Sequence, residues 1–503
     1  MSEREVAQQE RRKDPGSRGA MLIALVLGVL LFGLVVWVQL GGGKGSPAEG
    51  AGAAEAAGVA IAPADDMFGI MARALGKIAI GSQREGERFP AWGWGMLEDP
   101  GQSATKLIRL AIVEGAGRST DDAIARLDDA ESRLREDAER EDAGDAAGAQ
   151  EAEGEGVVAT REALASDIAD LRTIYEHGTD GLDDETRARL VEHHGWFGEL
   201  ALAHGDDARI GELVKGWRRI LYFATAMVVL LCAWLVAGLA MGTLAIVLIA
   251  TGRLRWQFDP PAPGGSVYLE MFPMFIAMFL VVSVGMDLLG LALKSQFGWS
   301  IDAIVVARLV SQWLIVLVVA YPLLRGVRWS RASHDLGWHR GRGVVREVLA
   351  GIAGYLAGVP LLIGAALLTA ALNAVVGAAR GGPPPTPNNP VVDILVSASP
   401  VVIALLVVLA TLWAPIVEET VFRGALYRHL RSRMAPVVAG LVSGTLFAFM
   451  HSYGWTFTPP LIALGFTFAM VREWRGSLIA PMTAHLLHNG TLMVMLVVGM
   501  QVA

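Results

Sequence analysis

The feature that most constrains this chain is a series of apolar runs long enough to cross a lipid bilayer. The first run, MLIALVLGVLLFGLVVWVQL at 21–40, contains no charged residue, and about 20 apolar residues in a helix span the hydrocarbon core. Backbone groups in lipid must find hydrogen-bond partners within the protein, so such runs form helices. Only 18% of the residues are charged, against roughly 25% in soluble domains. The sequence therefore predicts an all-α polytopic membrane protein.

Nine apolar runs are candidates for membrane helices, and we predict about 8–9 transmembrane helices. The runs lie at 21–40, 220–251, 268–293, 301–324, 348–378, 391–416, 436–452, 456–471 and 478–500. The first exceeds the roughly 7–15 apolar residues of a signal peptide, which predicts an uncleaved transmembrane anchor behind a cytoplasmic tail at 1–20. Cleavage within the small residues that follow stays open.

Lys and Arg in the short loops predict the orientation in the membrane. The loop 325–347, the segment 428–433 and the loop 472–475 are rich in Arg. Alternating spans place all three on the side of the N-terminus. We therefore expect a cytoplasmic N-terminus in a bacterial inner (plasma) membrane, although Lys215, Arg218 and Arg219 lie on the opposite side and do not follow this scheme.

Residues 65–215 differ from the rest of the chain in charge. They contain 34 Asp or Glu and 17 Lys or Arg, a net charge of −17, against −8 for the whole chain. Apolar residues at helical spacing predict an acidic helical soluble domain outside the cytoplasm; they are Ile124, Leu127, Leu134, Leu164, Ile168, Leu171 and Ile174. We expect a flexible linker at 41–64 before it, a disordered loop at 143–156 within it and a multi-span membrane domain at 220–503 after it.

The acidic domain shows no catalytic pattern, and we expect it to recruit a protein partner or a substrate. His193 and His194, with the pairs Asp121–Asp122 and Asp183–Asp184, resemble metal ligands in type. A solvated helix face and helix N-termini are the simpler interpretation of these residues. Basic residues are scattered through the chain, which does not predict nucleic-acid binding, and one cysteine, Cys232, leaves no disulfide framework.

Charged residues inside the apolar runs need a partner or a function, because a charge at the bilayer centre costs about 3 kcal/mol or more. The segment EETVFRG, residues 418–424, places Glu418 and Glu419 together with Arg423 one turn later. Asp287 and Arg308 lie in neighbouring runs, and we favour an ion pair between them over a polar cavity. Two GxxxG patterns, at 354–358 and 440–444, predict close helix packing.

Histidines near the C-terminus fall on two further runs, in LFAFMHS at 446–452 and APMTAHLLHNG at 480–490. A helical hairpin that turns near 434–435 brings Glu418 and His451 to the same level, roughly 25 Å from its tip. His485 reaches a similar depth, and Asn489 shares its helix face at i+4. His488 points elsewhere and is interpreted as a bystander. Three separate segments thus carry polar groups at one depth.

These segments resemble the EExxxR, FxxxH and HxxxN motifs of the CPBP intramembrane proteases, a family that includes CAAX-processing type II prenyl endopeptidases and proteins tied to bacteriocin immunity. The resemblance covers a protease core at about 390–500. It implies that Glu418 and His451 activate water, and that His485 and Asn489 stabilise the oxyanion. Glu419 and Arg423, at i and i+4, would form an orienting ion pair.

The metal requirement stays open at this point. Glu418, His451 and His485 have the donor types of a three-ligand zinc site, but the same residues serve a metal-free glutamate mechanism, which we favour because Asn489 suits an oxyanion role. The expected function is intramembrane endopeptidase, acting on membrane-anchored, lipidated or CAAX-like peptides in the lipid bilayer. A non-catalytic bacteriocin-immunity or scaffolding protein and a transporter remain as alternatives.

Overall fold

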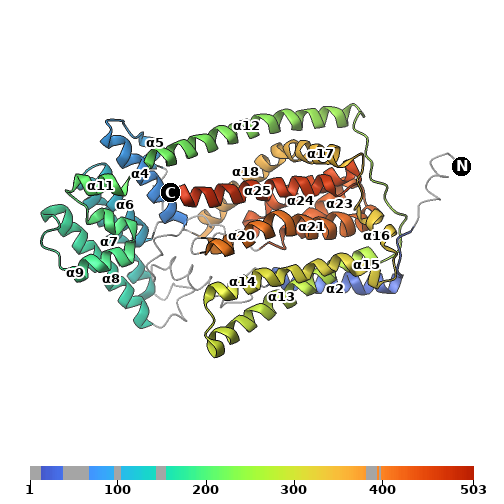
Figure 1. Cartoon of the computed structure of the whole chain (residues 1–503), viewed down its shortest axis with the longest axis horizontal. Helices are drawn as coiled ribbons and strands as arrows, with labels where there is room; N and C mark the ends of the chain where they lie inside the picture. Colours follow the sequence, from blue (N-terminus) through green and yellow to red (C-terminus); the bar gives the residue numbers. More distant parts are fainter. Residues whose placement is uncertain are drawn as a thin grey trace. The chain divides into compact units, whose positions relative to one another are not determined.

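The computed structural model describes residues 13–37, 67–95, 103–142, 154–380, 394–395, 398–451 and 453–502. All of their regular elements are helices (Figure 1), which confirms the all-α prediction. The chain divides into two compact units. The membrane unit comprises Met1–Gly42 and Leu230–Val497, and the acidic unit comprises Gly43–Val229 and Val498–Ala503.

Seven helical stretches of the described residues are long and apolar enough to cross a membrane, close to the predicted number. They are Arg18–Trp37, Asp207–Ala250, Val267–Phe297, Ile301–Leu324, Val344–Ala379, Pro400–Arg431 and Ile479–Met500. The predicted spans at 436–452 and 456–471 correspond to α23 (Pro436–Ala448), which is short, and α24 (Thr458–Arg475), whose last turns carry Arg472, Glu473 and Arg475. The protein is an integral membrane protein.

The helices of the membrane unit follow the apolar runs closely. Besides α23 and α24, they include α2 (Arg18–Trp37), α13 (Val267–Phe297), α14 (Ile301–Ser311), η3 (Gln312–Ala320), α15 (Tyr321–Leu324), α16 (Trp329–Leu336), α17 (Val344–Ala357), α18 (Val359–Arg380) and α20 (Pro400–Val408). Most of α12 (Trp217–Ala250) and of α25 (Ile479–Val502) also belongs to this unit. Helix α2 begins three residues before the predicted anchor, and the end of that anchor, 38–40, lies outside the described residues, as does the predicted linker 41–64.

Both GxxxG patterns permit close helix packing, as predicted. A Cβ on Gly444 would lie 2.9 Å from the Ile462 carbonyl oxygen and the Phe466 nitrogen of α24, so α23 and α24 pack side by side through their backbones (Figure 1). A Cβ on Gly354 would lie 2.4 Å from Val471. Small residues at these positions are therefore required by sterics.

The stretch from Pro400 to Arg431 alternates between two kinds of helix. After α20 come the π-helical turn η4 (Leu409–Trp413), the short α21 (Ala414–Glu418), the π-helical η5 (Glu419–Leu426) and α22 (Tyr427–Arg431). A π turn is wider than an α turn and is frequent at functional sites. Glu418 is the last residue before the second wide segment.

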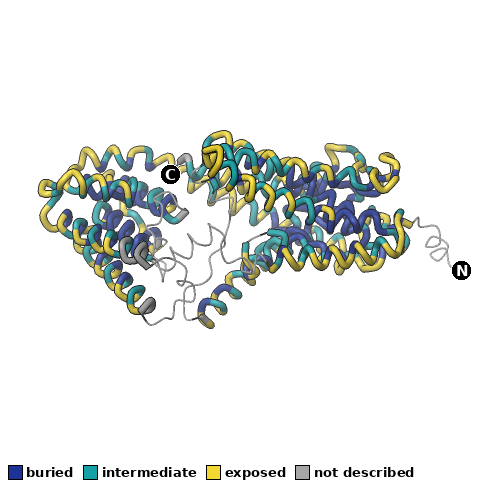
Figure 2. Tube along the Cα trace, turned by 90° about the horizontal axis from the view of Figure 1, so that it is seen from below, coloured by how far each residue is buried: buried dark blue, intermediate teal, exposed yellow. Residues whose placement is uncertain are grey.

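Aromatic packing and ion pairs fix the membrane unit, whose buried residues (dark blue in Figure 2) gather inside its helical bundle. Phe422 packs edge-on against Phe272, Phe275 and Phe447. Asp287 and Arg308 pair at 2.8 Å, as predicted. This pairing accounts for the two charges inside neighbouring apolar runs.

The predicted cytoplasmic tail is partly folded onto the membrane unit. Asp14 is buried and its Oδ1 lies 2.8 Å from Arg428 Nη2, while Arg331 donates to the Lys13 carbonyl at 2.9 Å. The Asp14 pKa is raised because burial outweighs the nearby Arg428. Residues 1–12 lie outside the described part of the chain.

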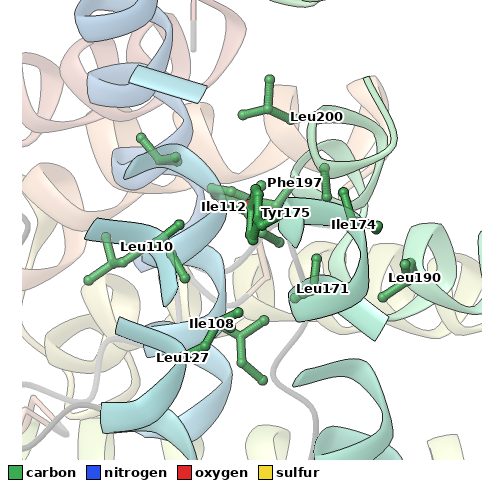
Figure 3. Close-up of a cluster of buried hydrophobic side chains, with 14 of the residues drawn as sticks. Ile108, Leu110, Ile112, Leu127, Leu171, Ile174, Tyr175, Leu190, Phe197 and Leu200 are labelled. Atoms are coloured by element: carbon green, nitrogen blue, oxygen red, sulfur yellow. The ribbon is translucent and has the colours of Figure 1, made fainter. Parts of the chain in front are cut away.

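The acidic unit has a hydrophobic core of its own (Figure 3), in which Ile108, Leu127, Leu171 and Phe197 are fully buried. Its helices are α4 (Met67–Arg84), α5 (Ala91–Gly95), α6 (Ala104–Gly117), α7 (Thr120–Asp142), α8 (Gly154–His177), α9 (Asp184–His194), α10 (Trp196–Ala201) and α11 (Asp207–Leu213). Of the predicted disordered loop, 143–153 lie outside the described residues and 154–156 already belong to α8.

One expectation about the acidic unit was right and another was wrong. Asp183 caps α9 by accepting a hydrogen bond from the Thr186 nitrogen at 2.8 Å, as expected for a helix N-terminus. His193 and His194 do not lie on a solvated face. His194 is fully buried, and both rings contact the buried carboxylate of Asp167, a residue too distant in sequence for local periodicity to reveal.

Candidate active site

Glu418, at the end of α21, presents its carboxylate to a cavity of about 630 Å³. Its side chain is 14% exposed, and Oε2 is buried without a hydrogen-bond donor among the described residues. A buried carboxylate oxygen without a donor is costly, since its lost hydration is not replaced. The hydrogen-bonding capacity of the Glu418 carboxylate is thus not filled by the protein, although the residue lines the cavity.

Glu419, the next residue, is not part of the cavity lining, and its carboxylate contacts His485. Both side chains are buried, and Glu419 Oε1 lies 2.9 Å from His485 Nδ1. The same oxygen accepts a hydrogen bond from Arg423 Nη1 at 3.0 Å, and Arg423 Nη2 donates to the Gly465 carbonyl at 2.9 Å. The predicted ion pair is thus present, and it fixes the imidazole as well. The other ring nitrogen, Nε2, lies 3.9 Å from Glu418 Oε2.

His451 follows the end of α23 and has one nitrogen engaged by the backbone. Its Nδ1 lies 2.9 Å from the Phe447 carbonyl, so Nδ1 carries the hydrogen and donates it. The lone pair of Nε2 is then left to accept a hydrogen bond. The ring also stacks on Tyr453, with centroids 6.2 Å apart, which limits its rotation.

Asn489 is held by a wide turn of a helix distant in sequence. Its Nδ2 donates to the Ala410 carbonyl at 2.9 Å, and Ala410 belongs to the π-helical η4. A carboxamide nitrogen has two hydrogens, so one remains for a second acceptor. Local sequence patterns do not predict this contact, because 79 residues separate its partners.

The cavity is lined by the four predicted catalytic side chains and by His488, which the sequence analysis interpreted as a bystander. Glu418, His451, His485 and Asn489 all line it, and so does His488. His488 Nδ1 lies 3.2 Å from the Tyr355 hydroxyl. Its i+3 spacing from His485 is the sequence signal that places the two on neighbouring parts of a helix surface. The remaining lining is almost entirely apolar.

The proposed three-ligand metal set does not fit this arrangement. Glu418, His451 and His485 do not form, within the described residues, a group whose ligand atoms all lie within 4.8 Å of one another. Atoms bound to one zinc ion lie about 3.3 Å apart, given ligand distances of about 2.0–2.2 Å. We therefore derive no step through a metal ion.

Comparison with protein families identifies the segment that carries this site. Residues 400–491 match the family described as type II CAAX prenyl endopeptidase Rce1-like. This segment is an Rce1-like domain. It contains all four lining residues that the motifs singled out, and the match is consistent with the CPBP resemblance. No curated protein and no solved structure matches the chain. The match supports a CAAX-type intramembrane endopeptidase in general terms.

Proposed function

We propose that the Rce1-like domain hydrolyses a peptide bond of a membrane-associated substrate in the cavity at Glu418, His451, His485 and Asn489. The observation that carries this proposal is the convergence of the four side chains, from three separate segments, on one cavity. Glu418 Oε2 and Glu419 Oε2 are also buried without a donor among the described residues, and such atoms are uncommon in protein interiors.

In the proposed reaction, Glu418 is the general base and His451 positions the water. Water donates one hydrogen to the Glu418 carboxylate and the other to His451 Nε2. Glu418 takes the first proton as the water oxygen attacks the scissile carbonyl carbon. The proton then passes from Glu418 to the departing amine nitrogen as the C–N bond breaks, which restores the carboxylate and balances the reaction.

His485 and Asn489 would stabilise the oxyanion. With both ring nitrogens of His485 protonated, Nδ1 donates to Glu419 and Nε2 can donate to the oxyanion. The second hydrogen of Asn489 Nδ2 supplies another donor. Such donors act best when they are already fixed in place, and the contacts to Glu419 and to the Ala410 carbonyl provide that fixation.

The cavity wall supports an apolar substrate. Side chains such as Leu362, Leu461, Leu464 and Leu492 line it beside the polar groups. Apolar pockets with a few directed polar groups bind ligands that are mostly hydrocarbon. We propose membrane-anchored peptides, including lipidated or CAAX-like ones, as the substrate class.

The remaining proposals concern placement. The Arg-rich loops support a cytoplasmic N-terminus in a bacterial inner membrane, with the acidic domain at 65–215 outside and available to a protein partner. Along the chain, this domain would lie between the linker 41–64 and the multi-span domain 220–503.

Cleavage by the purified protein tests the proposal. Wild type, Glu418→Gln and the control Asp287→Asn, which removes a carboxylate remote from the cavity lining, are incubated with a library of membrane-anchored reporter peptides, with and without a strong chelator. We expect cleavage by wild type and control, and a loss of about 10²- to 10⁴-fold in Glu418→Gln. Equal cleavage by all three would refute the role of Glu418. Loss with chelator and recovery with zinc would refute the metal-free mechanism.

A further inference from the structure

The acidic unit contains a second cluster of carboxylate and imidazole groups, unrelated to the cavity in the membrane unit. Asp167 Oδ2 lies 2.6 Å from His193 Nδ1 and 3.2 Å from His194 Nε2. Within the described residues, these three form the one group of His, Cys, Asp or Glu whose ligand atoms all lie within 4.8 Å of one another. The site proposed below does not depend on the proposed function.

The geometry of two helices explains how adjacent histidines reach one point. Asp167 lies in the middle of α8, and the histidines form the last turn of α9. Successive helical side chains diverge by about 100°. His193 uses the near nitrogen, Nδ1, and His194 the far nitrogen, Nε2, so rings that start in different directions meet at the same carboxylate oxygen.

Two carboxylates and two guanidinium groups surround the cluster. Arg189 Nε donates to Asp167 Oδ1 at 3.1 Å and Arg189 also pairs with Asp170, so two carboxylates face one guanidinium. This contact occupies Oδ1 and leaves Oδ2 to the histidines. The C-terminal end of a helix favours positive charge, and both histidines lie there. The other nearby cation, Arg109, donates to the His193 carbonyl at 3.4 Å.

Burial and access are also compatible with an ion. Asp167 and His194 side chains are fully buried, whereas His193 is 20% exposed. Exposure on one side allows an ion to enter and allows a water molecule to complete the coordination. Buried carboxylates and imidazoles that already converge need little rearrangement on binding.

We propose that Asp167 Oδ2, His193 Nδ1 and His194 Nε2 bind a divalent cation of the Zn²⁺ type, with water as the fourth ligand. Two imidazole nitrogens and one carboxylate oxygen match the ligand types of such sites, whereas Ca²⁺ and Mg²⁺ prefer oxygen ligands alone. Atoms around a tetrahedral zinc ion lie about 3.3 Å apart; the His194 distance of 3.2 Å is already close to this value, whereas the 2.6 Å contact of His193 is a hydrogen bond that lengthens when the ion replaces its proton. On binding, each neutral imidazole presents a lone pair to the ion and carries its hydrogen on the other ring nitrogen.

Direct metal binding tests this site. The full-length protein in detergent is stripped with a chelator and titrated with ZnCl₂, and bound zinc is measured by mass spectrometry and calorimetry. The variants are His193→Gln, the exposed control His177→Gln, and Glu418→Gln for the membrane cavity. We expect one zinc that His177→Gln and Glu418→Gln retain. His193→Gln should lower the affinity for zinc by more than 100-fold, because removal of an outer-shell partner alone costs roughly 10- to 100-fold.

A spectroscopic measurement on the wild type tests the site even if His193→Gln does not fold. Co²⁺ in the stripped protein should give the visible absorption of a tetrahedral site, and zinc should displace it. No zinc binding by the wild type, unchanged affinity in a folded His193→Gln, or loss of the single zinc in Glu418→Gln would each overturn the proposal. The last result would place the ion in the membrane unit and leave the cleavage assay as an independent test of the proposed function.

Discussion

The two clusters of carboxylate and imidazole groups in this protein differ more in spacing than in composition. In the membrane unit, His485 contacts Glu419 at 2.9 Å, but Glu418 stands 3.9 Å from the same ring. In the acidic unit, both imidazoles contact a single oxygen of Asp167. The first cluster borders a cavity of about 630 Å³, whereas the second joins side chains of α8 and α9.

This difference shows how spacing selects chemistry. A carbonyl group and a water molecule need room between the base and the oxyanion donors, which the open cluster provides. A metal ion needs its ligands close together, which the compact cluster provides. The comparison predicts that changes in one cluster leave the function of the other intact.

The largest expected effect, after that of Glu418→Gln, concerns the oxyanion. Asn489→Asp preserves the shape of the side chain but removes its N–H donors. We expect a fall in kcat of about 10²- to 10³-fold, the usual cost of losing one oxyanion donor. Single-turnover cleavage measures it, and zinc binding by the acidic unit serves as the control. Unchanged kcat would show that His485 acts alone or that the oxyanion lies elsewhere.

The next effect concerns the orientation of His485. Glu419→Gln removes the carboxylate that holds Nδ1 and leaves the buried Arg423 without its ion-pair partner. We expect activity to fall by about 10- to 100-fold, as for other outer-shell partners, and stability to fall by about 3–5 kcal/mol.

A double variant separates these two effects of Glu419. Glu419→Gln with Arg423→Met removes the unpaired charge, so thermal stability should recover while activity stays low. If activity recovers together with stability, Glu419 serves only to compensate Arg423, and its role in orienting His485 is wrong.

A smaller effect is expected from the cap of α9, the helix that carries His193 and His194. Asp183→Ala removes the acceptor for the Thr186 nitrogen, which costs about 1 kcal/mol. Tryptophan fluorescence during denaturant unfolding should detect the loss through Trp94 and Trp196. Peptide cleavage should be unchanged, and a parallel loss of cleavage would show that the two units are energetically coupled.

The smallest expected effect is a pH dependence of the acidic unit. Burial lowers the pKa of His204 below its ordinary value of 6.5, so the unfolded chain binds a proton more readily than the folded one. The resulting stability is present above pH 6.5 and is lost as the pH falls toward the lower pKa of the folded state.

His204→Phe isolates this contribution and keeps an aromatic ring against Tyr175, which His204 contacts edge-on. Between pH 8 and 5.5, Tm should fall less steeply in the variant than in the wild type, with chelator present in both. The stability that His204 contributes to this difference should stay below about 1.4 kcal/mol, because the range extends only one pH unit below 6.5. Parallel Tm curves would show that His204 does not contribute.

The sequence by itself determined the all-α class and the membrane location. Those properties follow from local rules, because lipid requires every backbone group to be hydrogen-bonded within its own segment. The motifs also indicated the side chains that line the cavity, since Glu418, His451 and His485 each interrupt an apolar run. The i,i+4 spacing was enough to predict the Glu419–Arg423 pair.

Only the tertiary structure decided which polar groups meet across long stretches of chain. The contact of Asn489 with the Ala410 carbonyl depends on a π-helical turn that no local pattern announces, and His488 reached the cavity despite its assignment as a bystander. The solvated face expected for His193 and His194 was wrong because Asp167 approaches from another helix. Helical periodicity reports which face of a segment is apolar, but the partner of that face is set by packing between segments.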